Sequence, residues 1–216
     1  MKEYHKIQTV YKRDPATKFK TLLDGEFSLP EFEYLKDNEW VFTEKVDGTN
    51  IRVEFDGETI TFGGRTERAS IPAPLVARLN ALFLHQLDLF YREFPDGVTL
   101  YGEGYGAKIQ KGGGNYCAYQ DFVLFDVKVG AWWLQREDVE SIAELLGVSA
   151  VPIIGAGPLI QMINWAERGF CSKWGDFPAE GIVARPATEL QTRGGERIIT
   201  KIKCKDFPKE QAHEKQ

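Results

Sequence analysis

The sequence Glu44-Lys45-Val46-Asp47-Gly48-Thr49-Asn50-Ile51-Arg52 joins an apolar run at residues 40–42 to alternating apolar residues at Ile51, Val53 and Phe55. Such alternation is typical of a strand with one buried face, and Asp-Gly is a frequent tight connection between strands. The pattern therefore predicts one strand over residues 39–46 and a second over 50–56. It places Lys45 at the rim of a sheet, where the strands hold its amine still. A solvated lysine beside an ordinary β-turn explains these nine residues equally well.

Composition limits the classes of protein to which the chain can belong. Of its 216 residues, 43% are hydrophobic and 12% aromatic, which is enough for a substantial core. The net charge of −5 argues against coating nucleic acid by bulk charge, although it leaves room for a local basic groove. The three cysteines lie far apart and show neither a disulfide framework nor zinc spacing. No signal peptide or membrane-length apolar run occurs, so we expect a cytoplasmic protein.

Periodicity predicts the remaining elements. Apolar residues three and four apart predict one long helix over residues 73–94, and shorter helices are expected over 139–146 and 158–168. Strands are predicted over residues 59–62, 98–103, 122–129, 181–185 and 197–205. Because hairpins outnumber strand–helix–strand units, we expect an α+β fold with mainly antiparallel sheets. On the last predicted strand, Lys203 and Lys205 are two residues apart and would share a face.

Familiar catalytic motifs are absent. No Gly-x-x-x-x-Gly-Lys-Ser/Thr loop occurs, and Gly102-x-Gly104-x-Gly106 does not open an apolar helix. The three histidines are widely separated, and nothing suggests a Ser-His-Asp arrangement. Instead, charged residues gather where predicted strands end. A cleft lined with both signs suits a polyphosphate with a metal ion, since cations hold phosphates and carboxylates hold metal. The strand-end charges are Lys45, Asp47, Arg65, Glu103, Asp126, Glu180, Lys203 and Lys205.

These residues form an ordered series of motifs. Lys45-x-Asp47-Gly48-x-Asn50 resembles the nucleotidyl-lysine motif of covalent nucleotidyltransferases, namely RNA ligases, DNA ligases and mRNA capping enzymes. The chain is most similar to nick-sealing RNA ligases of the RNA ligase 2 type, over roughly residues 35–207. The further motifs in order are Arg65, Gly102-Glu103 with Ile109-Gln110-Lys111, Phe125-Asp126, Glu180-Gly181-Ile182-Val183 and Ile202-Lys203-Cys204-Lys205.

The resemblance implies a fold of antiparallel sheets flanked by helices, with a nucleotide cleft between them. It implies a single nucleotidyltransferase domain over residues 1–216, and we expect no C-terminal OB-fold or helical domain. The implied reaction joins RNA ends at the expense of ATP, with Mg²⁺ or Mn²⁺. The implied partner is RNA with a 5′-phosphate and a 3′-hydroxyl, together with a helper protein or domain that supplies end binding.

The resemblance also implies residue roles. Lys45 would attack the α-phosphate of ATP, which requires its neutral amine. Only about one free lysine amine in a few thousand is neutral at pH 7. Neighbouring cations and desolvation must therefore favour the neutral form of Lys45. Glu180, Lys203 and Lys205 are the other expected catalytic residues, and Glu180 and Asp47 the expected metal ligands. Glu103 is expected on the ribose, Phe125 on the adenine and Glu44 near the base edge. The expected nucleotide-binding residues are Glu44, Val46, Asn50, Arg65, Glu103, Phe125, Lys203 and Lys205.

Alternative interpretations remain open for the chain and for single residues. The whole could be a DNA ligase, a GTP-using guanylyltransferase or a non-catalytic module that binds nucleotide or RNA. Phe125 alone would be an ordinary core residue. Arg65 alone could pair with Glu67 or Asp47. Lys203 and Lys205 alone could be a solvated strand face.

Overall fold

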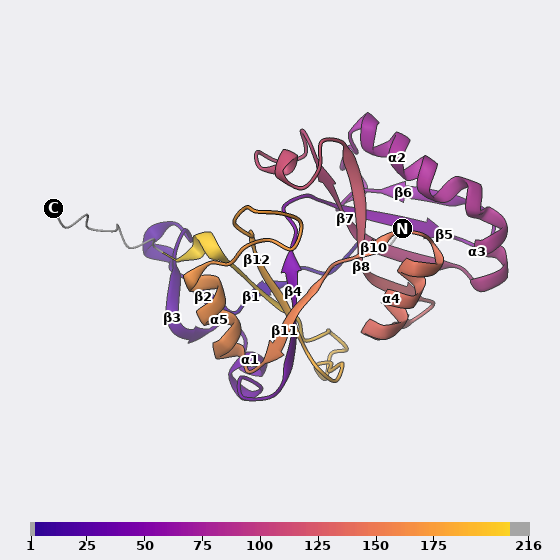
Figure 1. The fold of residues 1–216 in the computed structure, drawn as a ribbon. Coiled ribbons are helices and arrows are strands. Elements are labelled where there is room, and N and C mark those ends of the chain that lie inside the picture. The colour runs from indigo at the N-terminus through magenta and orange to yellow at the C-terminus, as the bar shows by residue number, and fades with distance from the viewer. Residues whose placement is uncertain (1–2, 208–216) are drawn as a thin grey trace. The chain divides into compact units, whose positions relative to one another are not determined.

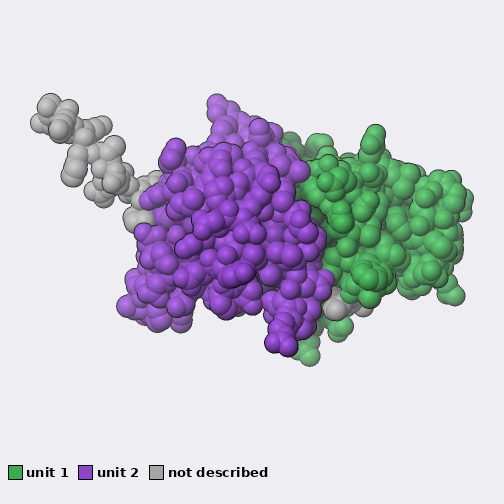
Figure 2. All heavy atoms as spheres, turned by 90° about the horizontal axis from the view of Figure 1, so that it is seen from below, with its two compact units in different colours: residues 1–5, 46–151 green, residues 6–45, 152–216 purple. Residues whose placement is uncertain are grey.

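The computed structural model describes residues 3–207, and their contacts divide the chain into two compact units, coloured separately in Figure 2. Unit 1 comprises Met1–His5 and Val46–Val151, and unit 2 comprises Lys6–Lys45 and Pro152–Gln216. The chain therefore passes between units directly after Lys45 and returns at Pro152. The single nucleotidyltransferase domain over residues 1–216 stays a prediction.

Unit 1 is built on one six-stranded sheet with the order β10-β8-β7-β5-β6, with β9 paired to β8 (Figure 1). Neighbouring strands are antiparallel except for the parallel pair β10 and β8. Alternate residues of β5 and β7 enter a hydrophobic core, which is why the apolar residues of this stretch recur at every second position. The strands are β5 (Thr49–Phe55), β6 (Ile60–Gly63), β7 (Val98–Gly106), β8 (Gln120–Val129), β9 (Trp132–Trp133) and β10 (Ser149–Ala150).

Helices of unit 1 cover the core face of this sheet. Both α2 (Ala73–Phe83) and α4 (Arg136–Leu145) pack on β8. The single helix predicted over residues 73–94 is wrong in its continuity, because the 3-10 turn η2 (Leu84–Gln86) separates α2 from α3 (Leu87–Glu93). At the break, the side chain of Gln86 donates to the carbonyls of Leu82 and Leu146, at 2.6 and 2.9 Å. A side-chain amide that competes for main-chain carbonyls interrupts the helical ladder.

Unit 2 contains a five-stranded sheet with the order β1-β13-β12-β4-β11. Only β1 and β13 pair in parallel among these described strands. A two-stranded sheet, β2 (Tyr11–Arg13) and β3 (Leu22–Phe27), shares the same hydrophobic core with α1 (Pro30–Tyr34) and α5 (Leu159–Arg168). The five strands are β1 (Gln8–Thr9), β4 (Trp40–Lys45), β11 (Ile153–Gly157), β12 (Gly181–Pro186) and β13 (Thr200–Lys203), and the short turns of the chain include η1 (Pro15–Thr17), η3 (Gly113–Asn115) and η4 (Cys204–Asp206).

The sequence prediction of an α+β fold with mainly antiparallel sheets is confirmed. One strand boundary matters for function: the strand predicted over residues 197–205 ends at Lys203, and Lys205 lies in η4. The prediction that Lys203 and Lys205 share a strand face is therefore wrong. None of the described helices is long and apolar enough to cross a membrane.

Candidate functional site

Three adjacent strands of unit 2 bring Lys45 and Lys203 to the same position across the sheet. Gly181 on β12 is paired in register with Lys45 on β4 and with Lys203 on β13. Residues directly opposite each other on neighbouring strands project from the same face of a sheet. The two lysines thus lie one strand apart on one face, on either side of a glycine.

Glu180 joins these two lysines. The Nζ atom of Lys45 donates to Glu180 Oε2 at 2.5 Å, and the Nζ atom of Lys203 lies 2.6 Å from Glu180 Oε1. The side chains of Lys45, Glu180 and Lys203 are 20%, 10% and 26% exposed, so water screens the three charges incompletely. One carboxylate therefore holds two ammonium groups that would otherwise repel each other.

The glycine between the lysines is required by close packing. A Cβ atom added to Gly181 would lie 2.1 Å from the carbonyl oxygen of Ile202 and 2.8 Å from the Cα atom of Lys203. No side chain fits there without displacing the backbone of β13. The Glu180-Gly181 pair thus combines a bridging acid with the one residue type that lets β12 approach Lys203 so closely.

Lys205 is placed differently from Lys203. It is exposed in the turn η4, which begins where β13 ends. The intervening Cys204 is half-buried, and burial raises the pKa of its thiol. The main-chain N–H of Cys204 donates to the carbonyl of Glu180 at 2.9 Å, so the turn is tied to the same segment as the bridging carboxylate.

Glu44 lies on the opposite side of β4 from Lys45 and is 1% exposed. Its two carboxylate oxygens accept hydrogen bonds from the Ser172 hydroxyl at 2.6 Å and from the Lys173 N–H at 2.7 Å. The Ser172 hydroxyl oxygen also accepts from the N–H of Trp174 at 3.1 Å. Glu44 therefore anchors the segment between α5 and β12, while its expected position near a base edge stays a prediction.

In unit 1, the Asp47-Gly48 turn is held from two sides. A Cβ atom added to Gly48 would lie 2.2 Å from the Gly104 carbonyl oxygen and 2.7 Å from Cγ of Glu103, so the Glu103 side chain packs directly over this glycine. From the loop after β7, Gln110 donates to the Gly48 carbonyl at 2.9 Å, and Tyr116 accepts from the Asp47 N–H at 3.1 Å.

Asn50 and Glu103 are neighbours on the sheet face opposite the core of unit 1. They are paired in register on β5 and β7. The Oδ1 atom of Asn50 is buried, and no donor within residues 3–207 reaches it. A buried amide oxygen without a donor is costly, so this atom is suited to a hydroxyl group supplied by a ligand.

Arg65 is exposed just beyond β6. The residue before it, Gly64, accepts a hydrogen bond at 2.8 Å from Nε of Arg52, which is 1% exposed. Within the described part of the chain, Arg65 forms no ion pair with Glu67 or Asp47. A buried arginine thus holds the segment that presents Arg65 to solvent.

Phe125 lies at an irregularity of β8. The register shifts between Tyr101 and Gly102 of β7, which pair with Asp126 and Leu124, so Phe125 is the extra residue of a bulge. Bulges re-aim side chains, and this one places Phe125 outside the alternating core pattern. Tyr4 lies edge-on to its ring, with the centroids 5.1 Å apart, and donates a 2.6 Å hydrogen bond to Asp126.

The surroundings of Phe125 are aromatic. Tyr4 also contacts the rings of Tyr101 and Trp133, at centroid distances of 5.1 and 5.6 Å. Burial raises the pKa of Tyr101, while the Coulombic effect of Arg52 lowers it in part. Phe125 is therefore supported by an aromatic cluster and is neither fully buried nor isolated.

The carboxylates fit a metal ion that is shared with a ligand. Among residues 3–207, no three His, Cys, Asp or Glu side chains form a group able to hold a metal ion. Magnesium in phosphate-transferring sites is commonly held by one or two carboxylates together with waters and substrate phosphates. Glu180, whose oxygens already attract two cations, suits that arrangement.

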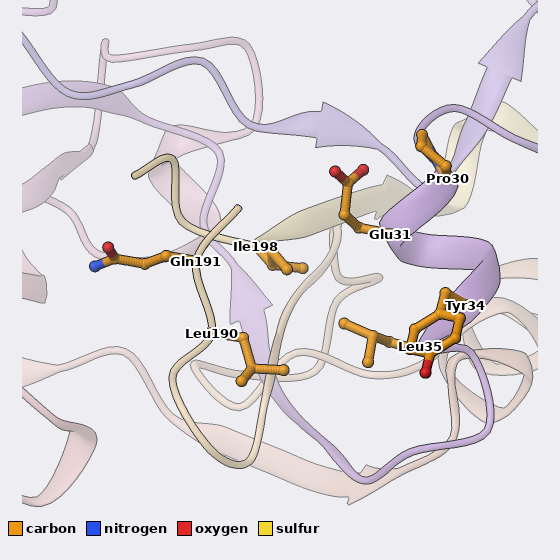
Figure 3. Close-up of a pocket in the computed structure, with 7 residues that line it drawn as sticks. All are labelled: Pro30, Glu31, Tyr34, Leu35, Leu190, Gln191 and Ile198. Carbon is orange, nitrogen blue, oxygen red and sulfur yellow. The ribbon is translucent and has the colours of Figure 1, made fainter. Parts of the chain in front are cut away.

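A separate cavity of about 380 Å³ lies in unit 2 between α1 and the segment around residues 190–198. Figure 3 shows Tyr34 and Leu35 on one side of it and Leu190 and Ile198 on the other. Its lining is mainly apolar and includes none of the predicted site residues. We therefore assign the cavity no role in the chemistry.

The sequence alone missed several residues that hold the predicted ones. Arg52 and Gln110 lie in quoted motifs, so their positions gave a signal, although not their contacts. Tyr4, Tyr116 and Ser172 lie at least 69 residues from their partners and carried no local signal.

The buried hydrogen bonds of Glu44 yield a prediction about stability. Replacing Glu44 by Ala should lower the free energy of unfolding by about 2–4 kcal/mol, because it removes two hydrogen bonds to a buried carboxylate. Urea unfolding measures the change. The matched control is Glu26→Ala, whose carboxylate is 55% exposed in an ion pair with Lys12 and should contribute less than about 1 kcal/mol. Equal losses for the two variants would contradict the anchoring role.

Comparisons with known proteins show which fold and family the chain resembles. Among solved structures, the chain resembles the RNA ligase of Naegleria gruberi. A variant of that protein with ATP and Mn is 21% identical with a TM-score of 0.63, and the match covers 81% of this chain and 52% of that one. An apo variant and the protein with PPi are each 20% identical with a TM-score of 0.64, and these matches cover 94% and 91% of this chain and 57% and 55% of those chains. The chain thus spans about half the length of these proteins. No curated protein sequence matches it. The RNA ligase family matches residues 38–203, and the chain belongs to that family.

Proposed function

We propose that this chain catalyses the nucleotidyl-transfer chemistry of an ATP-dependent RNA ligase through a covalent lysine-AMP intermediate. The observation that carries the proposal is the Lys45–Glu180–Lys203 arrangement within a segment that matches the RNA ligase family. The Naegleria gruberi structures, whose names include ATP, Mn and PPi, support ATP as the nucleotide and a divalent metal ion as its companion.

In the first step, Nζ of Lys45 attacks the α-phosphorus of ATP. A nitrogen–phosphorus bond forms, the bond to the β-phosphate oxygen breaks, and pyrophosphate leaves. The attacking amine must be neutral, so the ammonium first loses a proton. Glu180 Oε2 already accepts a hydrogen bond from this Nζ atom and is placed to receive that proton. The contact between Lys45 and Glu180 must then open as the amine turns to phosphorus.

In the next two steps, AMP passes from Lys45 to the 5′-phosphate of an RNA, and a 3′-hydroxyl then displaces it. Each step is an in-line displacement at phosphorus, in which positioning and charge neutralisation provide most of the catalysis. Lys203 and Lys205 would neutralise the phosphates. When bound, Mg²⁺ or Mn²⁺ would offset further phosphate charge, with Glu180 and Asp47 as its proposed ligands.

The nucleoside is assigned to the residues of unit 1. The buried Asn50 Oδ1 and the adjacent Glu103 would accept hydrogen bonds from ribose hydroxyls. Phe125 would stack on the adenine, with the aromatic cluster of Tyr4 behind it. Arg65 would contact sugar or phosphate. Val46 and Glu44 are the remaining proposed nucleotide contacts, with Glu44 near the base edge.

Two other functions compete with this one. A guanylyltransferase or DNA ligase would use the same lysine chemistry with a different nucleotide or polynucleotide. A non-catalytic binding module would need neither a nucleophile nor its bridging acid, so the intact Lys45, Glu180 and Lys203 argue against it. The match to the RNA ligase family supports RNA as the partner. Its 5′-phosphate and 3′-hydroxyl ends, and a helper protein or domain that presents them, are part of the proposal.

Covalent labelling tests the proposal directly. Incubation with α-labelled ATP and Mg²⁺ or Mn²⁺ should leave label on the protein in a denaturing gel, because the phosphoramidate survives unfolding. Lys45→Ala should abolish the band, because Lys45 is the only nucleophile that the proposed first step uses. A parallel reaction with labelled GTP separates a ligase from a capping enzyme. Absence of label on the unsubstituted chain, or persistence of label on Lys45→Ala, would falsify the enzymatic proposal.

Removing the bridging charges should slow labelling without unfolding the chain. Glu180→Ala and Lys203→Ala should each reduce the labelling rate by about 10²-fold or more, because a charged group that acts on the transition state is lost. Quench-flow labelling gives the rates. The unfolding free energy of Lys203→Ala should change by no more than about 1 kcal/mol. That of Glu180→Ala should fall further, because its loss leaves two ammonium groups to repel each other.

A second bridging carboxylate supplies the matched control. Glu189 lies 2.5 Å from Arg197 and 3.7 Å from Arg185 in the same unit, outside the proposed site. Glu189→Ala should label at the unsubstituted rate. If Glu189→Ala slowed labelling as much as Glu180→Ala, loss of structure would explain both.

End joining by the chain alone should be inefficient and sensitive to salt. With Lys203 and Lys205 assigned to ATP, the remaining candidate cations for RNA are Lys108, Lys111, Arg193, Arg197 and Lys201. Lys108, Lys111 and Arg193 are exposed and Lys201 is half-buried, whereas Arg197 is buried in its pair with Glu189 and is unsuited to that role. Three phosphate contacts predict a loss of binding of about 40-fold between 50 and 200 mM salt, from a slope of about −0.9 per contact.

A joining assay on a 5′-phosphorylated nick across a salt series measures this loss, with RNA and DNA strands exchanged. A pre-adenylylated RNA end should improve sealing, because it bypasses the first two steps. Substrates with a ribonucleotide at the 3′-hydroxyl side should be preferred. Efficient sealing in high salt would show that the chain binds duplex tightly by itself. Preference for all-DNA nicks would indicate a DNA ligase.

A further inference from the structure

An ion pair outside the expected site connects the N-terminal hairpin of unit 2 to the turn that carries Lys205. Arg13 ends β2, and its Nη2 atom donates to both carboxylate oxygens of Asp206, at 2.9 and 3.0 Å. The Asp206 side chain is 4% exposed and that of Arg13 is 28% exposed. The two residues are 193 positions apart in the sequence, so only the fold brings them together.

Asp206 also holds the main chain of a predicted catalytic residue. Its Oδ2 atom accepts a hydrogen bond from the N–H of Lys203 at 3.2 Å, which closes η4 on itself. Cys204, between them, donates its N–H to the Glu180 carbonyl. The turn is thus attached at one end to Arg13 and at the other to the segment of the bridging acid.

Lys205 depends on this turn for its position. Lys203 is placed by its ladder partner Gly181, whereas Lys205 lies beyond the last strand residue and has no ladder partner. The direction in which Lys205 projects is therefore set by η4, and the conformation of η4 is set by Asp206. Neither Arg13 nor Asp206 was among the residues expected at the site.

We propose that Arg13 and Asp206 are positioning residues that orient Lys203 and Lys205 toward the phosphates of the nucleotide. The inference rests on the proposed function, because its first test measures self-labelling with ATP. The ion pair differs from the neighbouring one between Lys12 and Glu26 on the same hairpin, whose side chains are 56% and 55% exposed. Surface pairs of that kind contribute little to structure.

Two substitutions break the positioning pair in different ways. Arg13→Met removes the cation and keeps much of the side-chain volume. Asp206→Asn removes the charge and keeps an oxygen that can accept from Lys203, so the turn can still close. Lys12→Met is the matched control. Circular dichroism at the assay temperature establishes that each variant is folded.

Single-turnover self-labelling with ATP is the first readout. Arg13→Met and Asp206→Asn should each slow labelling at least tenfold at a temperature where both are folded, and the double variant should be no slower than the worse single one. Lys12→Met should stay within twofold of the unsubstituted chain. Arg13→Lys should recover most of the rate, because the present contact uses one nitrogen rather than a two-nitrogen fork. A purely structural pair would lower the unfolding temperature and leave these rates unchanged.

Binding of inorganic pyrophosphate, measured by calorimetry, is the second readout and does not require catalysis. The dissociation constant should rise at least fivefold in Arg13→Met and Asp206→Asn and stay within twofold in Lys12→Met. If the unsubstituted chain does not label itself but shows this pattern, the proposed function fails and the positioning role stands. If folded Arg13→Met labels and binds pyrophosphate like Lys12→Met, the positioning role is wrong and the proposed function is unaffected.

Discussion

The carboxylate of Glu180 is the interaction on which the candidate site depends. It accepts hydrogen bonds or ion pairs from two lysines that the sheet of unit 2 brings to one face, one strand apart. Without an anion between them, two incompletely screened ammonium groups would repel each other. A polyphosphate carries several such anionic oxygens, so the arrangement that binds one carboxylate is also suited to exchanging it for a phosphate. In the proposed reaction, that exchange frees Lys45 for attack.

Close backbone approach is the second constraint. At Gly48 and at Gly181, a single added carbon atom would overlap a carbonyl oxygen of the neighbouring strand. These glycines allow Glu103 to pack over the Asp47-Gly48 turn and allow Lys203 to lie beside Glu180. The glycines beside Asp47 and Glu180 therefore have a steric reason that is independent of chain flexibility.

The two faces of the unit 1 sheet differ in chemical character. One face buries Ile51, Val53 and Leu100 beneath helices. On the other face, alternate residues of the same strands carry polar groups that are held by contacts, such as Arg52 bonded to Gly64, or that lack a donor within the described residues, such as Asn50 Oδ1. Because successive residues of a strand point to opposite faces, one short stretch contributes to both. In the proposed function, the aromatic cluster around Phe125 would contact the base.

Local patterns in the sequence determined the α+β class, the strands around Lys45 and the order of motifs that indicates the RNA ligase family. Alternation and turn residues act between near neighbours, so they can be followed along the chain alone. The tertiary structure decided the rest. Gln86 breaks the helix predicted over residues 73–94, a bulge re-aims Phe125, and the last strand stops before Lys205. Ser172 reaches Glu44 and Arg13 reaches Asp206 across more than a hundred residues. Such contacts depend on strand register and on charge burial, which arise only when distant segments pack together, and no local periodicity encodes them.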